Sequence, residues 1–255
     1  MDIIQAIIIG VVEGFTEFLP ISSTGHMIVV SDFLGLKQTD ALKAYEVIIQ
    51  FAAILAVMVE YRDKLTLKEI GLWSKVFVAF LPLAIVGFIF KDQIKAMFDP
   101  TLVAWMFIIG GVAFLIVEFF IYDEKKVRVR DIEEITLKDS IIIGLFQLLS
   151  FIPGTSRAGS TIIGGMLIGL SRKVAAEFSF LLAIPVMGAV SLYDLLKHYK
   201  DLLNGDIVAY SVGFVVAFVV AWLTIKLFLA FISRFSFVPF GIYRILVGIF
   251  LLYIL

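Results

Sequence analysis

The sequence predicts an all-α integral membrane protein in which six transmembrane helices and two re-entrant helical hairpins form an inverted-topology repeat. Hydrophobic residues make up 61% of the 255 residues, and the mean hydropathy is +1.06. A soluble domain is roughly half apolar, so the excess indicates a lipid environment. The apolar residues form six continuous blocks, and two further apolar regions are broken by polar residues. These observations together predict the fold class.

The six continuous blocks are residues 45–61, 76–90, 102–122, 178–193, 207–231 and 238–255. A spanning helix needs about 20 mostly apolar residues, and somewhat fewer when flanking side chains reach the membrane interface. We therefore expect one transmembrane helix in each block. Residues 123–139 are rich in charge and predict a polar connecting loop within a single membrane domain, residues 1–255.

The two interrupted regions are residues 3–34 and 140–170. Each has two apolar arms that are only about half to two-thirds of a spanning helix, on either side of a polar turn. We expect re-entrant hairpins whose turns lie inside the membrane, covered by protein or facing a wet cavity. The regions also resemble each other, because Gly10 and Pro20 in the first match Gly144 and Pro153 in the second.

A hairpin followed by three spans, present twice, places the second half upside down relative to the first. We expect inverted halves at residues 1–122 and 140–255, with both turns near the membrane midplane, where broken helices of such repeats meet. Lys and Arg are more abundant in the loops at 62–75, 123–139, 172–173 and 234, which predicts that these loops are cytoplasmic. Both chain termini and the mouth of the first hairpin then face outward.

Charge and cysteine content exclude several kinds of function. The net charge of −1 offers no electrostatic basis for binding nucleic acid. Because the chain has no cysteine, disulfides, thiol catalysis and thiolate metal sites are excluded. The first residues lack the basic region of a signal peptide, so we expect insertion through the protein's own helices.

Two acidic residues stand out in the first apolar arm. Glu13 and Glu17 are four residues apart and therefore share one face of a helix, with Cβ atoms about 5–6 Å apart. Ionisable groups inside a membrane are costly and are usually functional. Such a pair suits a hard divalent cation, Mg²⁺ or Ca²⁺, with phosphate oxygens and water completing the shell. One of the two could instead act as a base. The alternative without a function is that both glutamates lie near a helix end and contact water.

The first turn carries hydroxyl groups and a histidine. Pro20 ends the first arm, and the hydroxyl residues that follow suit the start of the next helix, whose free N–H groups favour phosphate. A serine nucleophile needs a nearby base, which His26 or a glutamate could supply. Capping alone would explain any single hydroxyl, and a structural hydrogen bond would explain His26. The candidate residues of this turn are Ser22, Ser23, Thr24 and His26.

The second turn adds a positive charge. Arg157 carries a planar guanidinium suited to phosphate oxygens, unless it reaches toward the interface instead. The hydroxyl residues around it could bind an anion together with helix N–H groups. Carboxylates in one turn and a cation in the other predict phosphoryl chemistry. The candidate binding residues here are Thr155, Ser156, Ser160 and Thr161.

Residues 14–26 and 153–157 resemble the two signatures of the undecaprenyl-diphosphate phosphatase (bacitracin-resistance) family, and the resemblance continues at residues 46–50 and 236–244. It implies hydrolysis of undecaprenyl diphosphate to undecaprenyl phosphate and phosphate, which recycles the carrier for peptidoglycan synthesis and confers bacitracin resistance. It also implies a divalent cation, Mg²⁺ or Ca²⁺, and a site in the bacterial plasma (inner) membrane that opens to the periplasmic face. Ala158 departs from the serine that the family often has. The residues implicated by the resemblance are Glu13, Glu17, Ser23, His26 and Arg157.

We expect Ser23 to be the nucleophile, with direct attack by water as the alternative, and His26 to act as base or leaving-group acid. Arg157 and the hydroxyl residues of the turns, Ser22 and Ser156 among them, would bind the diphosphate. The expected partners are the polyprenyl diphosphate lipid and the bilayer, with a homodimer as the alternative to a monomer and no nucleic acid. A transporter or flippase for an anionic substrate is the rival interpretation, since inverted repeats with half-helices also build transporters.

Overall fold

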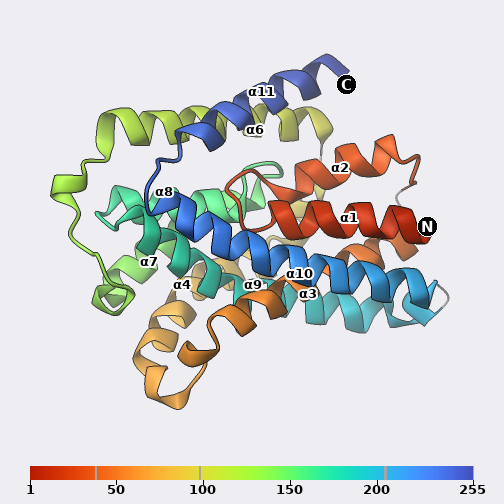
Figure 1. The fold of residues 1–255 in the computed structure, drawn as a ribbon, viewed down its shortest axis with the longest axis horizontal. Helices are drawn as coiled ribbons and strands as arrows, with labels where there is room; N and C mark the ends of the chain where they lie inside the picture. The colour runs from red at the N-terminus through yellow and green to blue at the C-terminus, as the bar shows by residue number, and fades with distance from the viewer. Residues whose placement is uncertain (38, 98, 204–205, 255) are drawn as a thin grey trace.

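The computed structural model describes residues 1–37, 39–97, 99–203 and 206–254, and within these residues almost all regular structure is helical (Figure 1). The first half contains α1 (Ile3–Thr16), α2 (Ser23–Phe33), α3 (Asp40–Glu60), α4 (Ile70–Ile89), α5 (Lys91–Ala96) and α6 (Pro100–Ile116). A π-helical turn, η3 (Val117–Ile121), extends α6. The second half contains α7 (Leu137–Gln147), the 3₁₀ turn η6 (Leu148–Phe151), α8 (Arg157–Leu167), α9 (Arg172–Leu203), α10 (Ile207–Ile232) and α11 (Val238–Ile254).

Polar side chains mark where several of these helices begin. Asp2 accepts a hydrogen bond from the Gln5 amide, and the Gln5 side chain accepts one from the Asp2 amide in return. Thr136 and Asp139 form the same reciprocal arrangement at the start of α7. Such caps satisfy amide groups that have no partner within the helix. Other starts are capped by a single side chain: Thr39 for α3, Asp99 for α6 and Asp206 for α10.

Within the described residues, five helices are long and apolar enough to cross a membrane, which identifies a multi-pass membrane protein. They match the first five predicted spans, except that Tyr61, Phe90 and Tyr122 lie one residue beyond the ends of their segments. The sixth predicted block forms α11, whose 17 residues reach about 26 Å, somewhat less than the hydrocarbon core of about 30 Å; residue 255 lies outside the described residues. Large apolar side chains such as Phe88 on α4 and Leu246 on α11 are exposed, as lipid-facing residues are. The five segments are Leu42–Glu60, Leu67–Ile89, Pro100–Ile121, Arg172–Tyr193 and Ile207–Ile232.

Both interrupted regions form two helices joined by a turn, as the sequence predicts: α1 and α2 in the first, α7 and α8 in the second. Helix α1 packs along α10, and α7 packs along α4. Helices α3 and α9 pack against each other, and α6 packs against α11. The two chain termini lie at one end of the molecule, on the right of Figure 1, and the connection from α6 to α7 lies at the other end.

Small residues let the first helix of each interrupted region approach a long helix closely. A Cβ atom added at Gly10 would lie 2.7 Å from the carbonyl oxygen of Gly213 in α10. One added at Gly144 of α7 would lie 2.5 Å from the carbonyl oxygen of Ala79 in α4. Neither position has room for a side chain. Close backbone contact through small residues is typical of helix packing in membranes.

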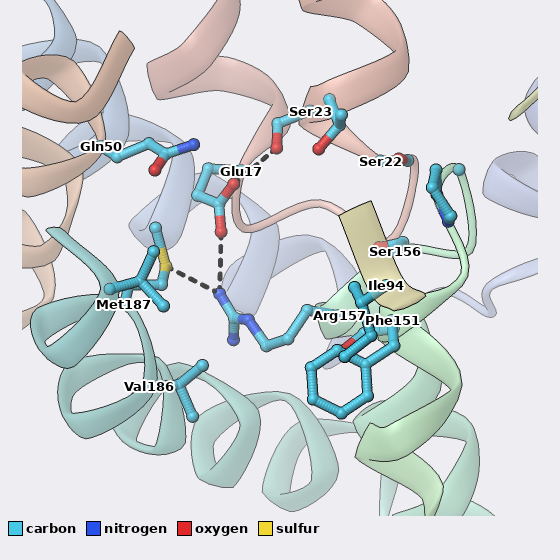
Figure 2. A pocket seen from close by; sticks show the side chains of 15 residues that line it. Glu17, Ser22, Ser23, Gln50, Ile94, Phe151, Ser156, Arg157, Val186 and Met187 are labelled. Atoms are coloured by element: carbon cyan, nitrogen blue, oxygen red, sulfur yellow. Dashed lines mark hydrogen bonds and ion pairs between the residues drawn. The ribbon is translucent and has the colours of Figure 1, made fainter. Parts of the chain in front are cut away.

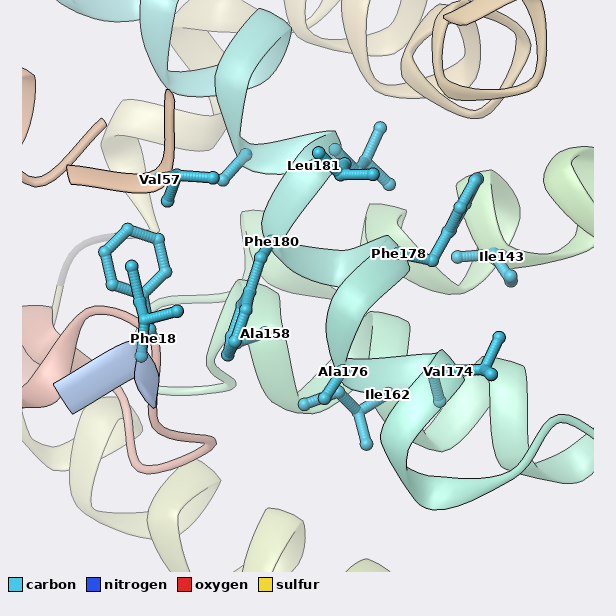
Figure 3. Close-up of a cluster of buried hydrophobic side chains, with 14 of the residues drawn as sticks. Phe18, Val57, Ile143, Ala158, Ile162, Val174, Ala176, Phe178, Phe180 and Leu181 are labelled. Carbon is cyan, nitrogen blue, oxygen red and sulfur yellow. The ribbon is translucent and has the colours of Figure 1, made fainter. Parts of the chain in front are cut away.

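Apolar side chains from both halves meet beneath the two turns (Figure 3). Phe18, just after α1, meets Phe180 of α9 edge to face, with ring centroids 5.4 Å apart. Ala158 and Ile162 of α8 belong to the same buried cluster. The first turn and the second turn are therefore supported by one common core.

The connection between the halves differs from the polar loop expected at residues 123–139. Lys125 and Lys126 are exposed, as expected. However, Val129, Ile132 and Ile135 are each 3% exposed or less and pack into the core. These apolar residues are scattered among charged ones, so the average composition of the segment conceals them.

Candidate active site

A cavity of about 380 Å³ lies between the two turns (Figure 2). Its polar wall comes from both turns, and its apolar wall comes mainly from α9 and the η6 turn. A cavity with one charged wall and one apolar wall suits a ligand that has both characters. Its lining residues are Glu17, Ser22, Ser23, Thr24, Gln50, Ile94, Ser150, Phe151, Pro153, Gly154, Ser156, Arg157, Val186, Met187 and Val190.

Two serines with unusual backbone geometry shape the turns. Ser22 has φ 68° and precedes α2, and Ser156 has φ 75° and precedes α8. No other described non-glycine residue has a positive φ. This region costs free energy for residues with a Cβ, and such residues gather at functional sites. The sharp bend at each serine places the following residue, Ser23 or Arg157, at the start of a helix on the cavity wall.

Glu17 joins the two turns. Its Oε2 accepts a hydrogen bond of 2.6 Å from the Ser23 hydroxyl, and its Oε1 lies 3.0 Å from Nη2 of Arg157 (Figure 2). The Glu17 and Arg157 side chains are 10% and 11% exposed, so the ion pair is largely withdrawn from water. One carboxylate therefore contacts both a hydroxyl that could act as nucleophile and a cation that could bind phosphate.

Arg157 has further contacts that fix its direction. Its Nη1 donates to the carbonyl oxygen of Ser179, 2.9 Å away, and its Nη2 lies 3.4 Å from the sulfur of Met187. Its Nε is buried and has no hydrogen-bond partner among the described residues. Buried polar groups are nearly always paired. Arg157 therefore lines the cavity with one N–H group to which no described residue is hydrogen-bonded.

Glu13 lies one turn before Glu17 on α1 and is 1% exposed, and its Oε1 has no hydrogen-bond partner among the described residues. It lines a second cavity of about 690 Å³, which adjoins the first because Thr24 and Gln50 line both. The shared helix face predicted for Glu13 and Glu17 thus opens onto two neighbouring cavities. Other charged residues of the second cavity are Asp32, Lys43 and Glu46.

The described residues offer a divalent cation one carboxylate oxygen without a hydrogen-bond partner and not a complete set of protein ligands. Among the described residues, no group of three acidic, histidine or cysteine side chains could hold a metal ion. Glu17 already contacts Ser23 and Arg157, whereas no described residue is hydrogen-bonded to Glu13 Oε1. Mg²⁺ is usually held by one or two carboxylates together with substrate phosphates and water. The residues fit a cation that binds together with a phosphate ligand.

His26 lies behind the first turn and lines neither cavity. Its Nδ1 is 2.7 Å from the carbonyl oxygen of Ser22, and its Nε2 is 2.7 Å from the hydroxyl of Tyr243 in α11. A carbonyl only accepts, so Nδ1 carries the hydrogen, and in the neutral ring Nε2 accepts from Tyr243. The rings of His26 and Tyr243 are also stacked, with centroids 5.7 Å apart.

The other predicted residues divide into two groups. Ser22, Thr24 and Ser156 line the first cavity, as Ser23, Glu17 and Arg157 do. Thr155, Ser160 and Thr161 do not line it. The Thr155 hydroxyl is buried, the Ser160 hydroxyl donates to the carbonyl of Ser156, and the Thr161 hydroxyl donates to Ser179.

Sequence reasoning missed several residues of this region. Gln50 lines both cavities, and its polar side chain within an apolar helix was the available signal. Arg244 is fully buried in α11 and contacts both turns, and it is a lone charge in an apolar block. Met187 carried no signal, because an apolar residue in an apolar helix is indistinguishable from its neighbours.

The fold and the cavity define a multi-pass helical membrane protein with a polar cavity lined by the starts of two helices, a carboxylate, serines and an arginine. The chain belongs to the bacitracin resistance protein BacA family, whose sequence model matches residues 6–250. A protein of Sulfurovum sp. (strain NBC37-1) named undecaprenyl-diphosphatase is 67% identical over 255 residues and covers all of both chains. Proteins of the same name from Sulfurimonas denitrificans and Persephonella marina are 62% and 55% identical, covering 98% or more of each chain.

Proposed function

We propose that this protein is an undecaprenyl-diphosphatase, which hydrolyses undecaprenyl diphosphate to undecaprenyl phosphate and inorganic phosphate. This reaction recycles the lipid carrier of peptidoglycan synthesis and underlies bacitracin resistance. The observation that carries the proposal is the contact of Glu17 with both Ser23 and Arg157 in a buried cavity. The names of the highly similar relatives support the same substrate.

The diphosphate binds at the polar wall of the first cavity, and the first isoprene units bind at its apolar wall. Arg157 turns its guanidinium, including the unpaired Nε–H, toward the phosphate oxygens. The free amides at the starts of α2 and α8 add partial positive charge. Val186, Met187 and Phe151, the apolar residues of the same cavity, contact the hydrocarbon.

Ser23 attacks the terminal phosphorus. A bond forms between its Oγ and phosphorus, the bond to the bridging oxygen breaks, and undecaprenyl phosphate leaves. Glu17 accepts the hydroxyl proton across the 2.6 Å hydrogen bond, as a general base does for a weak nucleophile. Arg157 counters the negative charge on the phosphoryl oxygens. Water then hydrolyses the phosphoserine, releases phosphate and regenerates Ser23; direct attack of water on the diphosphate, assisted by Glu17, is the alternative.

A divalent cation, Mg²⁺ or Ca²⁺, would be held by Glu13, with Glu17 as the second carboxylate if Arg157 moves to the phosphate. When bound, the cation neutralises charge on the diphosphate. The unpaired Oε1 of Glu13 and its position beside the substrate cavity support this assignment. His26 would act as base or leaving-group acid only if its imidazole ring moved, because both ring nitrogens are hydrogen-bonded, one to Ser22 and one to Tyr243.

We further propose that residues 1–122 and 140–255 are inverted halves of one domain in a bacterial plasma (inner) membrane, with the cavity open to the periplasmic face. The packing between the halves supports this repeat, because α1 of the first half packs on α10 of the second, and α7 of the second half packs on α4 of the first. The two strained serines before α2 and α8 support it as well. In this arrangement the two helix–turn–helix regions are re-entrant, and α11 is the sixth span.

Phosphate release by purified protein in detergent, supplied with undecaprenyl diphosphate and Mg²⁺, tests the activity. Ser23→Ala should lower turnover at least about 10³-fold, as loss of a nucleophile does. Ser191→Ala is the matched control, because the Ser191 hydroxyl is buried, has no hydrogen-bond partner among the described residues and lines neither cavity. Acid quenching with substrate labelled in the terminal phosphate should trap label on Ser23. Label in the wild type but not in Ser23→Ala supports the serine route, and turnover without label supports water attack. Lipid transfer without any phosphate release would leave the transporter interpretation and refute the enzyme.

A further inference from the structure

Arg244, in the last helix, is fully buried and outside the cavity. All of its hydrogen bonds to described residues go to backbone carbonyl oxygens. Charged side chains inside a membrane protein are costly and usually serve function. The reaction proposed above gives Arg244 no chemical step, so its burial needs another explanation.

The guanidinium of Arg244 contacts both turns of the site at once. Its Nη1 donates to the carbonyl oxygen of Pro20 in the first turn, 3.1 Å away. Its Nη2 donates to the carbonyl oxygen of Gly154 in the second turn, 3.0 Å away. The same side chain is anchored to α6, where Met106 and Phe107 accept at 2.8 and 3.3 Å.

These carbonyl groups lie where the chain leaves regular structure. Pro20 and Gly154 are outside α1, α2, α7 and α8, so no helix supplies their carbonyls with a partner. Unsatisfied backbone groups are poorly tolerated at membrane depth. The planar guanidinium donates to four carbonyl groups, on both turns and on α6, whereas an ammonium has only three N–H groups on a single nitrogen.

We infer that Arg244 is a positioning residue, which fixes the separation of the two turns and thereby aligns Ser23 and Glu17 with Arg157. This inference rests on the proposed phosphatase activity. Pro20 lies three residues before Ser23, and Gly154 lies three residues before Arg157. A change in the distance between the two carbonyls therefore moves the nucleophile relative to the group that binds phosphate.

Gly110 of α6 provides the space for this guanidinium. A methyl group added at Gly110 would overlap Nη2 and lie 2.7 Å from Cζ of Arg244. The ring of Phe107 lies on another side of the guanidinium, 5.3 Å from Cζ to its centroid. Enlarging Gly110 should thus displace the guanidinium without removing any donor.

Two substitutions with matched controls test the inference in the full-length protein in detergent. Arg244→Lys keeps the charge and loses the bridging donors, and Arg234→Lys is its control at an exposed site. Gly110→Ala displaces the guanidinium, and Gly71→Ala is its control, because a Cβ at Gly71 meets no atom within 4 Å. Both test variants should lower kcat about 10²-fold, the scale of a misplacement of about 1 Å. KM should change by less than about threefold, because Arg157 still binds the diphosphate.

A distance measurement adds a readout that needs no activity. The chain has no cysteine, so spin labels can be attached at two exposed positions, Thr24→Cys at the start of α2 beside the first turn and Leu149→Cys in η6 beside the second turn. The distance distribution should broaden or shift with Arg244→Lys and Gly110→Ala and stay unchanged with both controls. If the distance and kcat stay at the wild-type values in the test variants, the inference is wrong. An inactive wild type would refute the proposed function, while the distances would still decide whether Arg244 holds the turns.

Discussion

Replacing Glu17 by Gln removes the proposed general base and leaves the shape of the site almost unchanged. The amide has nearly the same shape as the carboxylate and can still accept a hydrogen bond from Arg157, but it cannot take the proton of Ser23 across the 2.6 Å contact. Loss of a general base typically costs about 10²–10⁴-fold in rate. This corresponds to about 2.7–5.5 kcal/mol in the activation free energy.

The same change also affects stability and binding. Breaking a buried ion pair by removing one charge costs about 3–5 kcal/mol. The Glu17–Arg157 pair is about one-tenth exposed, and the amide oxygen retains part of the contact, so we expect the lower end of that range. Without its carboxylate partner, Arg157 is free for the diphosphate, and KM should stay the same or fall.

A double-mutant cycle on phosphate release checks the reasoning. If Glu17 acts by receiving the proton of Ser23, then Glu17→Gln combined with Ser23→Ala should be no slower than Ser23→Ala alone, because residues that act as a unit are not additive. Initial rates at saturating substrate, corrected for folded protein, give the four kcat values. Losses that multiply in the double variant would refute the role of Glu17 as the base for Ser23.

Three further predictions concern charge, cation and topology. Arg157→Lys should restore only part of the activity that Arg157→Ala loses, since the ammonium lacks the fork that donates to both Glu17 and Ser179; phosphate release measures the difference. Glu13→Gln should raise the Mg²⁺ concentration needed for half-maximal turnover at least tenfold, because loss of a partner that only supports a ligand already costs about 10–100-fold. An unchanged Mg²⁺ titration would contradict a cation at Glu13. Single cysteines at the exposed positions Lys37 and Lys126 should be labelled by an impermeant maleimide only from outside and only from inside the cell, respectively; labelling of both from one side would contradict the inverted halves.

The order of apolar blocks and polar interruptions along the chain was sufficient to predict the five long apolar helices and both turns. Glu13, Glu17 and Arg157 are conspicuous because each is a charge in an apolar segment, and the structure brings Glu17 and Arg157 into contact. Periodicity could not separate His26 from the residues that line the cavities, since the place of its side chain depends on a contact with Tyr243, 217 residues further along the chain. Long-range contacts of this kind leave no local pattern.

The match between the two turns also had a limit. Aligning Pro20 with Pro153 places Ser22 opposite Thr155, but the backbone makes Ser22 the equivalent of Ser156. Gly154, with φ 90°, accommodates one additional residue in the second turn. A positive φ at a serine is invisible in the sequence, because serine has no intrinsic preference for that conformation.

The ion pair between Glu17 and Arg157 has a consequence for how the protein is made. The two residues are 140 positions apart, and chains are synthesised from the N-terminus, so Glu17 enters the membrane well before its partner exists. Until then, a charged side chain at this depth costs about 2.5–3.5 kcal/mol on insertion scales. The first half is therefore a folding intermediate in which Glu17 lacks its partner until Arg157 of the second half is inserted. A chain truncated before residue 157 would keep Glu17 in the membrane without its ion-pair partner, and this unpaired carboxylate is a feature by which membrane quality control could recognise it.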